Sequence, residues 1–229
     1  MNDAVPPMAG EDAGPTNCEI AESRNRVYLL LSTLLTKEVT PELLAILKNE
    51  MVAAAFGELD PDIACYLNDQ ESQKLLNDLA EEYAALFIVP GGISPHESVR
   101  LHGMLNQKPA WEAEAFYRRG GLVISDECRL MPDHLGMELE FMGYLAGREA
   151  EAHAKQDEEE AAKWIGLQGD FFQNHIDNWA FSFLTDLQRY AFHPFYKGLG
   201  SLTINYLKTE KGHLGIPERG EEMTLLYPR

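Results

Sequence analysis

The stretch MPDHLGMELEFMGYL, Met131 to Leu145, places an aspartate, a histidine and two glutamates among leucines, methionines and aromatic residues. Successive side chains rotate by about 100° around an α-helix. At that spacing four apolar residues share one stripe: Leu135, Leu139, Met142 and Leu145. Glu138 falls inside this apolar arc, whereas Glu140 falls on the opposite, solvated side. The stretch therefore predicts a helix that buries one carboxylate.

The polar residues at the start of this helix have several possible roles. Asp133 is placed to act as the N-cap, because its carboxylate can accept a backbone N–H of the first turn. His134 and Glu138 stand four residues apart, so they face each other on a helix. A buried ionised carboxylate is costly unless it is paired. The two residues therefore either satisfy each other or line a groove that receives a cation.

Three glycines of the same segment, Gly136, Gly143 and Gly147, fall together on another face of the helix. Each glycine costs roughly 1 kcal/mol of helix propensity relative to alanine. A face that keeps three of them predicts the close approach of another helix or of a bound chain.

The rest of the chain also shows helical periodicity, and no strand pattern repeats. Thr16 and Glu19 are spaced for a capping box, and Thr40 followed by Pro41 gives an N-cap with proline at the first helical position. We predict an all-α fold, a single globular domain of about nine or ten helices over residues 17–208. A disordered arm at 1–16 and a tail at 209–229 flank it. The breaker-rich segment 91–109 can mark an internal boundary, although one shared core is favoured.

Composition limits the function further. The 229 residues carry a formal net charge of −18, from 37 acidic and 19 basic side chains. This balance disfavours nucleic acid and anionic membrane surfaces, which need clustered Lys and Arg. It favours a basic partner, although an acidic surface also serves solubility alone. The three cysteines form no CxxC pair, which favours a reducing cytoplasm. No uncharged run of ~18 apolar residues predicts a membrane-spanning helix.

Motifs of common enzyme classes are missing from the sequence. It holds no GxxxxGK[ST] phosphate loop, no GxSxG and no HExxH. Glu149 and His153 would share the stripe of Glu138 if the helix continues, which suggests a carboxylate-type metal site. The ferritin-like pattern needs Glu-x-x-His on two helices, and Glu210 with His213 is the one such pair. We therefore predict no metal, no cofactor and no catalytic residues.

Four stretches resemble one family. MPDHLGMELEFMGYL resembles the Pro-Asp-His-x-Gly-x-Glu signature of the TorD/DmsD family of redox-enzyme maturation chaperones. Arg100 departs from the family pattern, where an aromatic residue is common. The resemblance covers about residues 20–208. Three further stretches are similar to family segments: YAALFIVPGG (Tyr83–Gly92), SPHESVR (Ser94–Arg100) and NWAFSFLTDLQRYAFHPFYKGLGSLTINYL (Asn178–Leu207).

This resemblance implies a cytoplasmic, TorD-like helical protein without catalytic activity. Such proteins bind the apo catalytic subunit of a molybdoenzyme, hold its twin-arginine signal peptide or N-terminus, and keep it competent for cofactor insertion before export. The resemblance also implicates Asp133 and His134 in binding, with Glu138 close behind.

A twin-arginine leader carries two guanidinium groups and then an apolar segment, so its receptor needs carboxylates beside an apolar groove. The alternatives are a helical carboxylate-type metal enzyme and a generic acidic helical adaptor, and a homodimer is compatible with each. The predicted peptide-binding residues are Asp133, His134, Glu138 and Glu97, with Trp111 and Tyr83 as groove walls.

Overall fold

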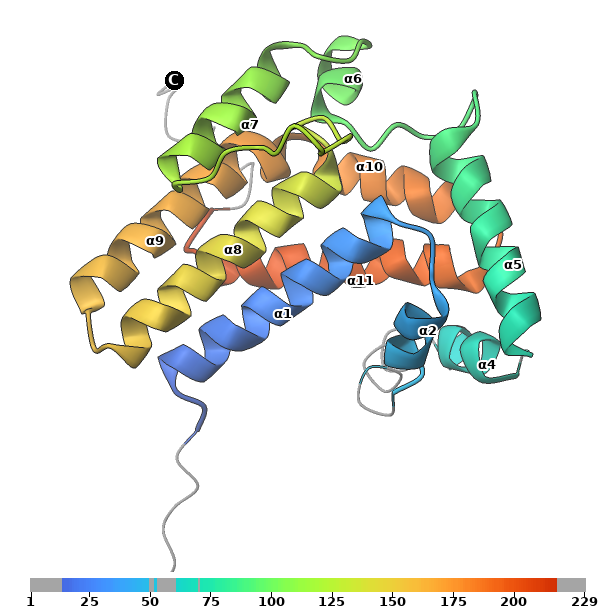
Figure 1. Cartoon of the computed structure of the whole chain (residues 1–229), viewed down its shortest axis with the longest axis horizontal. Helices are drawn as coiled ribbons and strands as arrows, with labels where there is room; N and C mark the ends of the chain where they lie inside the picture. The colour runs from blue at the N-terminus through green and yellow to red at the C-terminus, as the bar shows by residue number, and fades with distance from the viewer. Residues whose placement is uncertain (1–13, 50–51, 53–60, 70, 218–229) are drawn as a thin grey trace, which may run out of the picture.

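A computed structural model describes residues 14–49, 52, 61–69 and 71–217 of the chain. The described residues form helices and loops, with one isolated β-bridge between His96 and His134. The all-α prediction is confirmed. Long helices make the body of the molecule (Figure 1): α1 (Asn17–Thr36), α8 (Leu135–Ala154), α9 (Glu158–Phe171), α10 (Asp177–Tyr190) and α11 (Pro194–His213).

Helices α1 and α8 lie side by side because the glycine face of α8 removes the side chains that would keep them apart. A Cβ at Gly136 would meet the Thr36 Cγ2 atom at 2.1 Å, and one at Gly143 would meet Leu29 at 3.2 Å. The predicted close approach is thus the approach of α1. Opposite this contact, the stripe of leucines and Met142 is fully buried, and Glu140 is exposed, as predicted.

Helix ends follow the sequence signals at most positions. Thr16 and Glu19 form the predicted capping box of α1, in which the Thr16 amide donates to the Glu19 carboxylate at 2.8 Å. Thr40 caps α2 (Pro41–Leu47) through a hydrogen bond from the Leu43 amide. Helix α11 ends at His213, five residues beyond the predicted domain boundary at 208.

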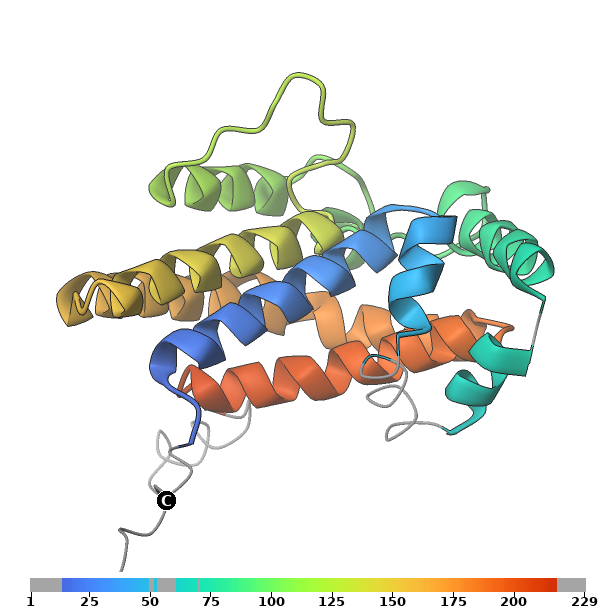
Figure 2. The same ribbon diagram turned by 60° about the horizontal axis from the view of Figure 1, so that its bottom comes forward.

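Shorter helices surround the long ones at one end and on one face. In Figure 1, α2, α4 (Pro61–Asp69) and α5 (Ser72–Tyr83) lie at one end of the body, while α6 (Glu97–His102) and α7 (Lys108–Arg119) cover one face. Two π-helical turns extend regular helices: η1 (Ala84–Ile88) follows α5, and η2 (Phe172–Ile176) joins α9 to α10. Figure 2 shows the segment after α7 arching away from the body before it returns to α8.

A buried ion-pair network joins the long helices and is called the Arg24 cluster: Arg24, Glu149, Gln168 and Glu210. The Arg24 guanidinium of α1 contacts Glu149 of α8 at 2.7 Å and Glu210 of α11 at 2.8 Å. The Gln168 amide of α9 donates to Glu149 at 2.8 Å and its oxygen accepts from Arg24 at 2.5 Å. Glu149 and Glu210, weighed above as metal ligands, therefore bind a guanidinium instead.

The predicted arm at 1–16 lies mostly outside the described residues, which begin at Gly14; the tail at 209–229 is described only to Pro217. No helix within the described ranges is long and apolar enough to cross a membrane.

Candidate functional site: a pocket between η1, α6 and α10, and the buried carboxylates beside it

The N-terminus of α8 is built differently from the sequence prediction. The helix begins at Leu135, and the N-cap is His134, whose Nδ1 atom accepts the Gly136 amide at 3.0 Å. The prediction that Asp133 caps this helix is therefore wrong. An imidazole nitrogen that accepts this amide must be unprotonated there, and burial lowers the pKa of His134 to about 3.

Asp133 caps a different helix. Its Oδ2 atom accepts the Ser98 amide in the first turn of α6 at 2.8 Å. The backbone on either side reinforces this contact, since the Glu97 amide donates to the Asp133 carbonyl at 3.0 Å and the Leu135 amide to the Pro95 carbonyl at 2.9 Å. Two of the four stretches that resemble the family, at 94–100 and 131–145, are thus joined by hydrogen bonds.

Glu138 and His134 do not pair, contrary to the first alternative considered for them. Glu138 Oε2 instead accepts the indole N–H of Trp179, on α10, at 3.2 Å, and Oε1 has no hydrogen-bond partner among the described residues. Beside it, the Glu97 carboxylate contacts His175 Nδ1 at 2.8 Å. We call Glu97, Asp133, Glu138 and His175 the Glu138 cluster.

Charge in the Glu138 cluster is poorly compensated. Burial raises the pKa of Glu138 well above its ordinary value, and the nearby Glu97 and Asp133 carboxylates raise it further. Burial also raises the pKa of Glu97, although the His175 contact opposes this rise. The cluster therefore favours a proton on Glu138.

The same groups have the donor types of a metal site. Glu97, Glu138 and His175 each place one ligand-type atom within 4.8 Å of the others, and carboxylate oxygen with imidazole nitrogen suits several divalent ions. Glu97 and His175 already satisfy each other, however, and protonation removes the charge of Glu138. We assign no metal to the cluster.

The structure places the predicted binding residues in three different environments. Asp133, His134, Glu138 and Glu97 are buried, with at most 4% of each residue exposed. The predicted cleft lined directly by these groups is therefore not open to a guanidinium from solvent. Two aromatic residues were predicted as groove walls: Tyr83 is buried against Phe87, and Trp111 is 60% exposed on α7, where its indole donates to Asn106.

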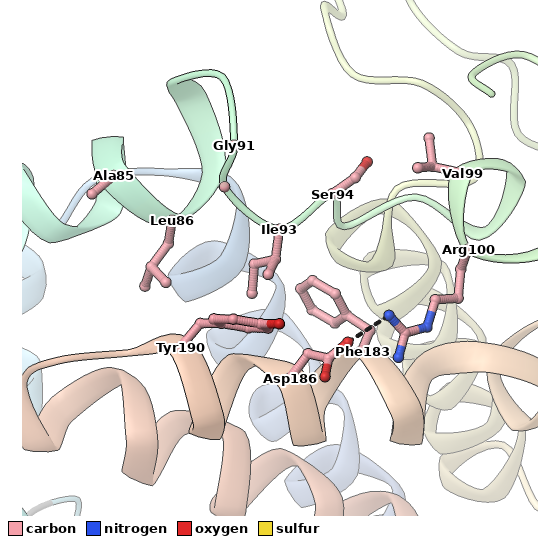
Figure 3. A pocket seen from close by; sticks show the side chains of 11 residues that line it. Ala85, Leu86, Gly91, Ile93, Ser94, Val99, Arg100, Phe183, Asp186 and Tyr190 are labelled. Atoms are coloured by element: carbon pink, nitrogen blue, oxygen red, sulfur yellow. Dashed lines mark hydrogen bonds and ion pairs between the residues drawn. The ribbon is translucent and has the colours of Figure 1, made fainter. Parts of the chain in front are cut away.

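A pocket of about 570 Å³ lies close to the buried residues, between η1 with its following loop, α6 and α10. Figure 3 shows apolar side chains from both walls turned toward its interior. Tyr190 of α10 is 59% exposed, so an aromatic face is available to a ligand. The apolar side chains of the lining are Ala85, Leu86, Ile93, Val99, Phe183 and Tyr190.

The charged residues that line this pocket are Arg100 of α6 and Asp186 of α10, which form an ion pair. The Arg100 Nη1 atom lies 2.6 Å from Asp186 Oδ2 (Figure 3). The Arg100 Nε atom also donates to Ser182 Oγ at 2.8 Å. About a third of the Arg100 side chain and a quarter of the Asp186 side chain remain exposed. Asp186 is thus an accessible carboxylate beside apolar surface, unlike the four buried candidates.

The sequence prediction missed this pocket because its walls come from segments about 100 residues apart. One local signal existed: Asp186 and Tyr190 stand four residues apart, so they share a face of a helix. Nothing local indicated that this face would meet the VPGG loop.

Comparisons with known proteins identify the family of this chain. The family model described as nitrate reductase delta subunit matches residues 49–185, which is more than half of the chain. The chain belongs to this family. The sequence-based assignment to the TorD-type chaperones is confirmed by curated relatives named "Chaperone protein TorD".

Two of these relatives illustrate the extent of similarity. The Vibrio parahaemolyticus protein is 27% identical over 210 residues, covering 84% of this chain and 95% of the relative. The protein from Shewanella sp. strain MR-4 is 27% identical, covering 87% and 97%. A solved structure of a candidate redox enzyme maturation protein from Archaeoglobus fulgidus aligns with a TM-score of 0.45 and 17% identity, covering 84% and 93%. The relatives of this family member are named as chaperones and not as enzymes.

Proposed function

We propose that this family member is a cytoplasmic, molybdoenzyme-specific chaperone that binds the twin-arginine signal peptide or N-terminus of an apo catalytic subunit. In this role it would assist cofactor insertion and assembly before export. The observation that carries the proposal is the pocket between η1, α6 and α10, which combines the exposed Tyr190 ring and a mostly buried apolar lining with the accessible Asp186 carboxylate. Family membership supports the same role.

The size and chemistry of the pocket suit a short peptide segment. Its volume of about 570 Å³ falls within the usual range of ligand pockets, about 300–1,000 Å³. A basic leader is also attracted over longer range by a chain of net charge −18. The pocket therefore meets both requirements set by the leader, an apolar surface and an acceptor for guanidinium.

Asp133 and His134 support this pocket without touching the peptide. Asp133 holds the first turn of α6, which carries Arg100 and Val99 to the pocket wall. His134 lies against His96 through the isolated β-bridge and an edge-to-face ring contact with centroids 5.0 Å apart. Substituting either residue would move the wall, so its effect on binding is indirect.

Titration of the purified protein with a fluorescently labelled twin-arginine leader tests this proposal by anisotropy. We expect binding that weakens when both arginines become lysine, because lysine lacks the two-pronged hydrogen bonding of a guanidinium. Tyr190→Ser should weaken binding about tenfold, since a buried aromatic contact contributes on the order of 1–2 kcal/mol.

The matched control is Val123→Ser. Val123 is 86% exposed and lines a different apolar hollow, between the 121–130 segment, α1 and α8. A loss of binding in this variant, with Tyr190→Ser unchanged, would move the site to that hollow. Equal affinity for a leader without arginine would contradict the proposed function itself.

A further inference from the structure

The guanidinium of Arg100 binds Asp186 at the position where the guanidinium of a bound peptide could bind. Arg100 extends from α6 across the pocket edge and places its guanidinium on a carboxylate of α10 (Figure 3). Among the described residues that line the pocket, Asp186 is the acidic one. A guanidinium entering from solvent therefore meets a carboxylate that is already in use.

We infer that Asp186 is the residue that selects for arginine in the bound peptide, and that the client guanidinium displaces Arg100 from it. This inference rests on the proposed function and specifies which atoms recognise the partner.

Displacement has a limited cost because the internal pair is only partly buried. Arg100 donates one hydrogen bond to Asp186 and one to Ser182, and both side chains of the ion pair retain contact with water. Partly exposed ion pairs contribute little to stability, and a released guanidinium is solvated readily. A client arginine that forms two parallel hydrogen bonds with the carboxylate would bind more strongly than Arg100 does.

The surroundings of Asp186 favour a guanidinium that is attached to an apolar chain. Phe183 precedes it by three residues and Tyr190 follows by four, so both share its face of α10. Ile93 and Leu86 extend the apolar surface on the opposite wall (Figure 3). A peptide with arginine next to apolar residues can therefore use both parts of the pocket at once.

Two single substitutions, each measured with two peptides, test the exchange. The peptides are a twin-arginine leader and the same leader with both arginines replaced by glutamine. Asp186→Asn should weaken binding of the arginine peptide about 5–20-fold and change binding of the glutamine peptide by less than about twofold. Arg100→Gln should tighten binding of the arginine peptide about 2–10-fold, because it removes the competitor and a like charge.

Arg148→Gln and Glu151→Gln are the matched controls. These residues form a partly exposed pair in the C-terminal half of α8, with nitrogen and oxygen 2.8 Å apart. They change net charge by the same amounts without touching the pocket, so both should leave the two affinities within about twofold of wild type. Circular dichroism and urea unfolding should be used to check that each variant remains folded.

The outcomes separate this inference from the proposed function. Selective loss with Asp186→Asn, together with a gain from Arg100→Gln, supports the exchange. If wild type prefers the arginine peptide and Asp186→Asn keeps that preference, the exchange is wrong while the proposed function stands. If wild type binds neither peptide, both are overturned.

Discussion

Two buried polar clusters of this molecule contain similar groups but satisfy them very differently. In the Arg24 cluster, the Arg24 guanidinium donates to both the Glu149 and the Glu210 carboxylates. The Gln168 amide donates a further hydrogen bond to Glu149. The Glu138 cluster contains three carboxyl groups and one histidine, which contacts Glu97. In this cluster Asp133 Oδ1 and Glu138 Oε1 have no hydrogen-bond partner among the described residues. Buried polar groups are usually paired, so the second cluster is the exception.

The position of each cluster explains the contrast. The Arg24 cluster joins α1, α8, α9 and α11 through buried hydrogen bonds. The Glu138 cluster lies where α6, η2 and α10 meet the start of α8, close to the pocket. One cluster stabilises the body, while the other carries an electrostatic cost at the part of the protein that we propose binds the client.

Removing the cation of the satisfied cluster should have the largest effect. Arg24→Met leaves Glu149 and Glu210 buried without their partner, which should lower the free energy of unfolding by about 3–5 kcal/mol. Urea unfolding at neutral pH measures this change. Arg26→Met is the matched control: its side chain is 67% exposed and pairs with Glu22 within one helix, so we expect a change below about 0.5 kcal/mol.

Neutralising one carboxylate in each cluster should produce effects of opposite sign. Glu138→Gln keeps an acceptor for Trp179 and removes the cost of holding this carboxyl group protonated at pH 7, so it should raise the free energy of unfolding by roughly 1–3 kcal/mol at that pH. Glu149→Gln removes a charge that Arg24 needs and should lower it by a similar amount. Destabilisation by both variants would show that the Glu138 cluster is satisfied after all.

The raised pKa of Glu138 also predicts how the stability of the protein depends on pH. Because its folded pKa is raised, the unfolded state releases this proton first, at a pH near the ordinary glutamate value. The stabilising contribution of Glu138 to the free energy of unfolding is fully present below that pH, and it is lost as the pH rises toward the folded pKa. The advantage of Glu138→Gln at pH 7 should therefore disappear at about pH 4.

His134 should have the opposite effect to Glu138, because it should lower the stability of the folded protein as the pH falls. Its pKa is lowered to about 3, so below its ordinary pKa of about 6.5 the unfolded state binds a proton that the folded state does not. Between pH 7.5 and pH 5 this residue alone should cost about 2 kcal/mol. His134→Asn retains a capping side chain and does not titrate, so urea midpoints at the two pH values should differ less than in wild type. An unchanged difference would show that His134 is not the titrating group.

The smallest effect is expected at Asp133. Asp133→Ala removes the cap of α6 and should lower the free energy of unfolding by about 0.5–2 kcal/mol. Leader binding should weaken while the preference for arginine over glutamine is retained, because Asp133 positions the wall and does not contact the peptide. A variant that loses the preference itself would indicate direct contact.

The sequence predicted those features that depend on neighbours along one helix. The buried stripe and the glycine face of α8 follow from rotation per residue, so a close contact on the glycine face was predicted, although α1 was not identified as the neighbour. The role of Asp133 was not, since its partner Ser98 lies 35 residues earlier and no local pattern specifies it. His134 and Glu138 failed to pair because the helix begins after His134, which leaves the histidine outside the regular turn.

The π-helical turn η1 determines how its end of the pocket is shaped. A π turn holds one more residue than an α turn between hydrogen-bonded partners, here from the Val89 amide back to the Ala84 carbonyl at 2.9 Å. Deleting one residue from 84–88 would replace the π turn by an ordinary α turn and shorten the segment between α5 and the glycine loop. Leu86 and the glycine loop face Tyr190 across the pocket, so the length of this short segment contributes to the width of the pocket.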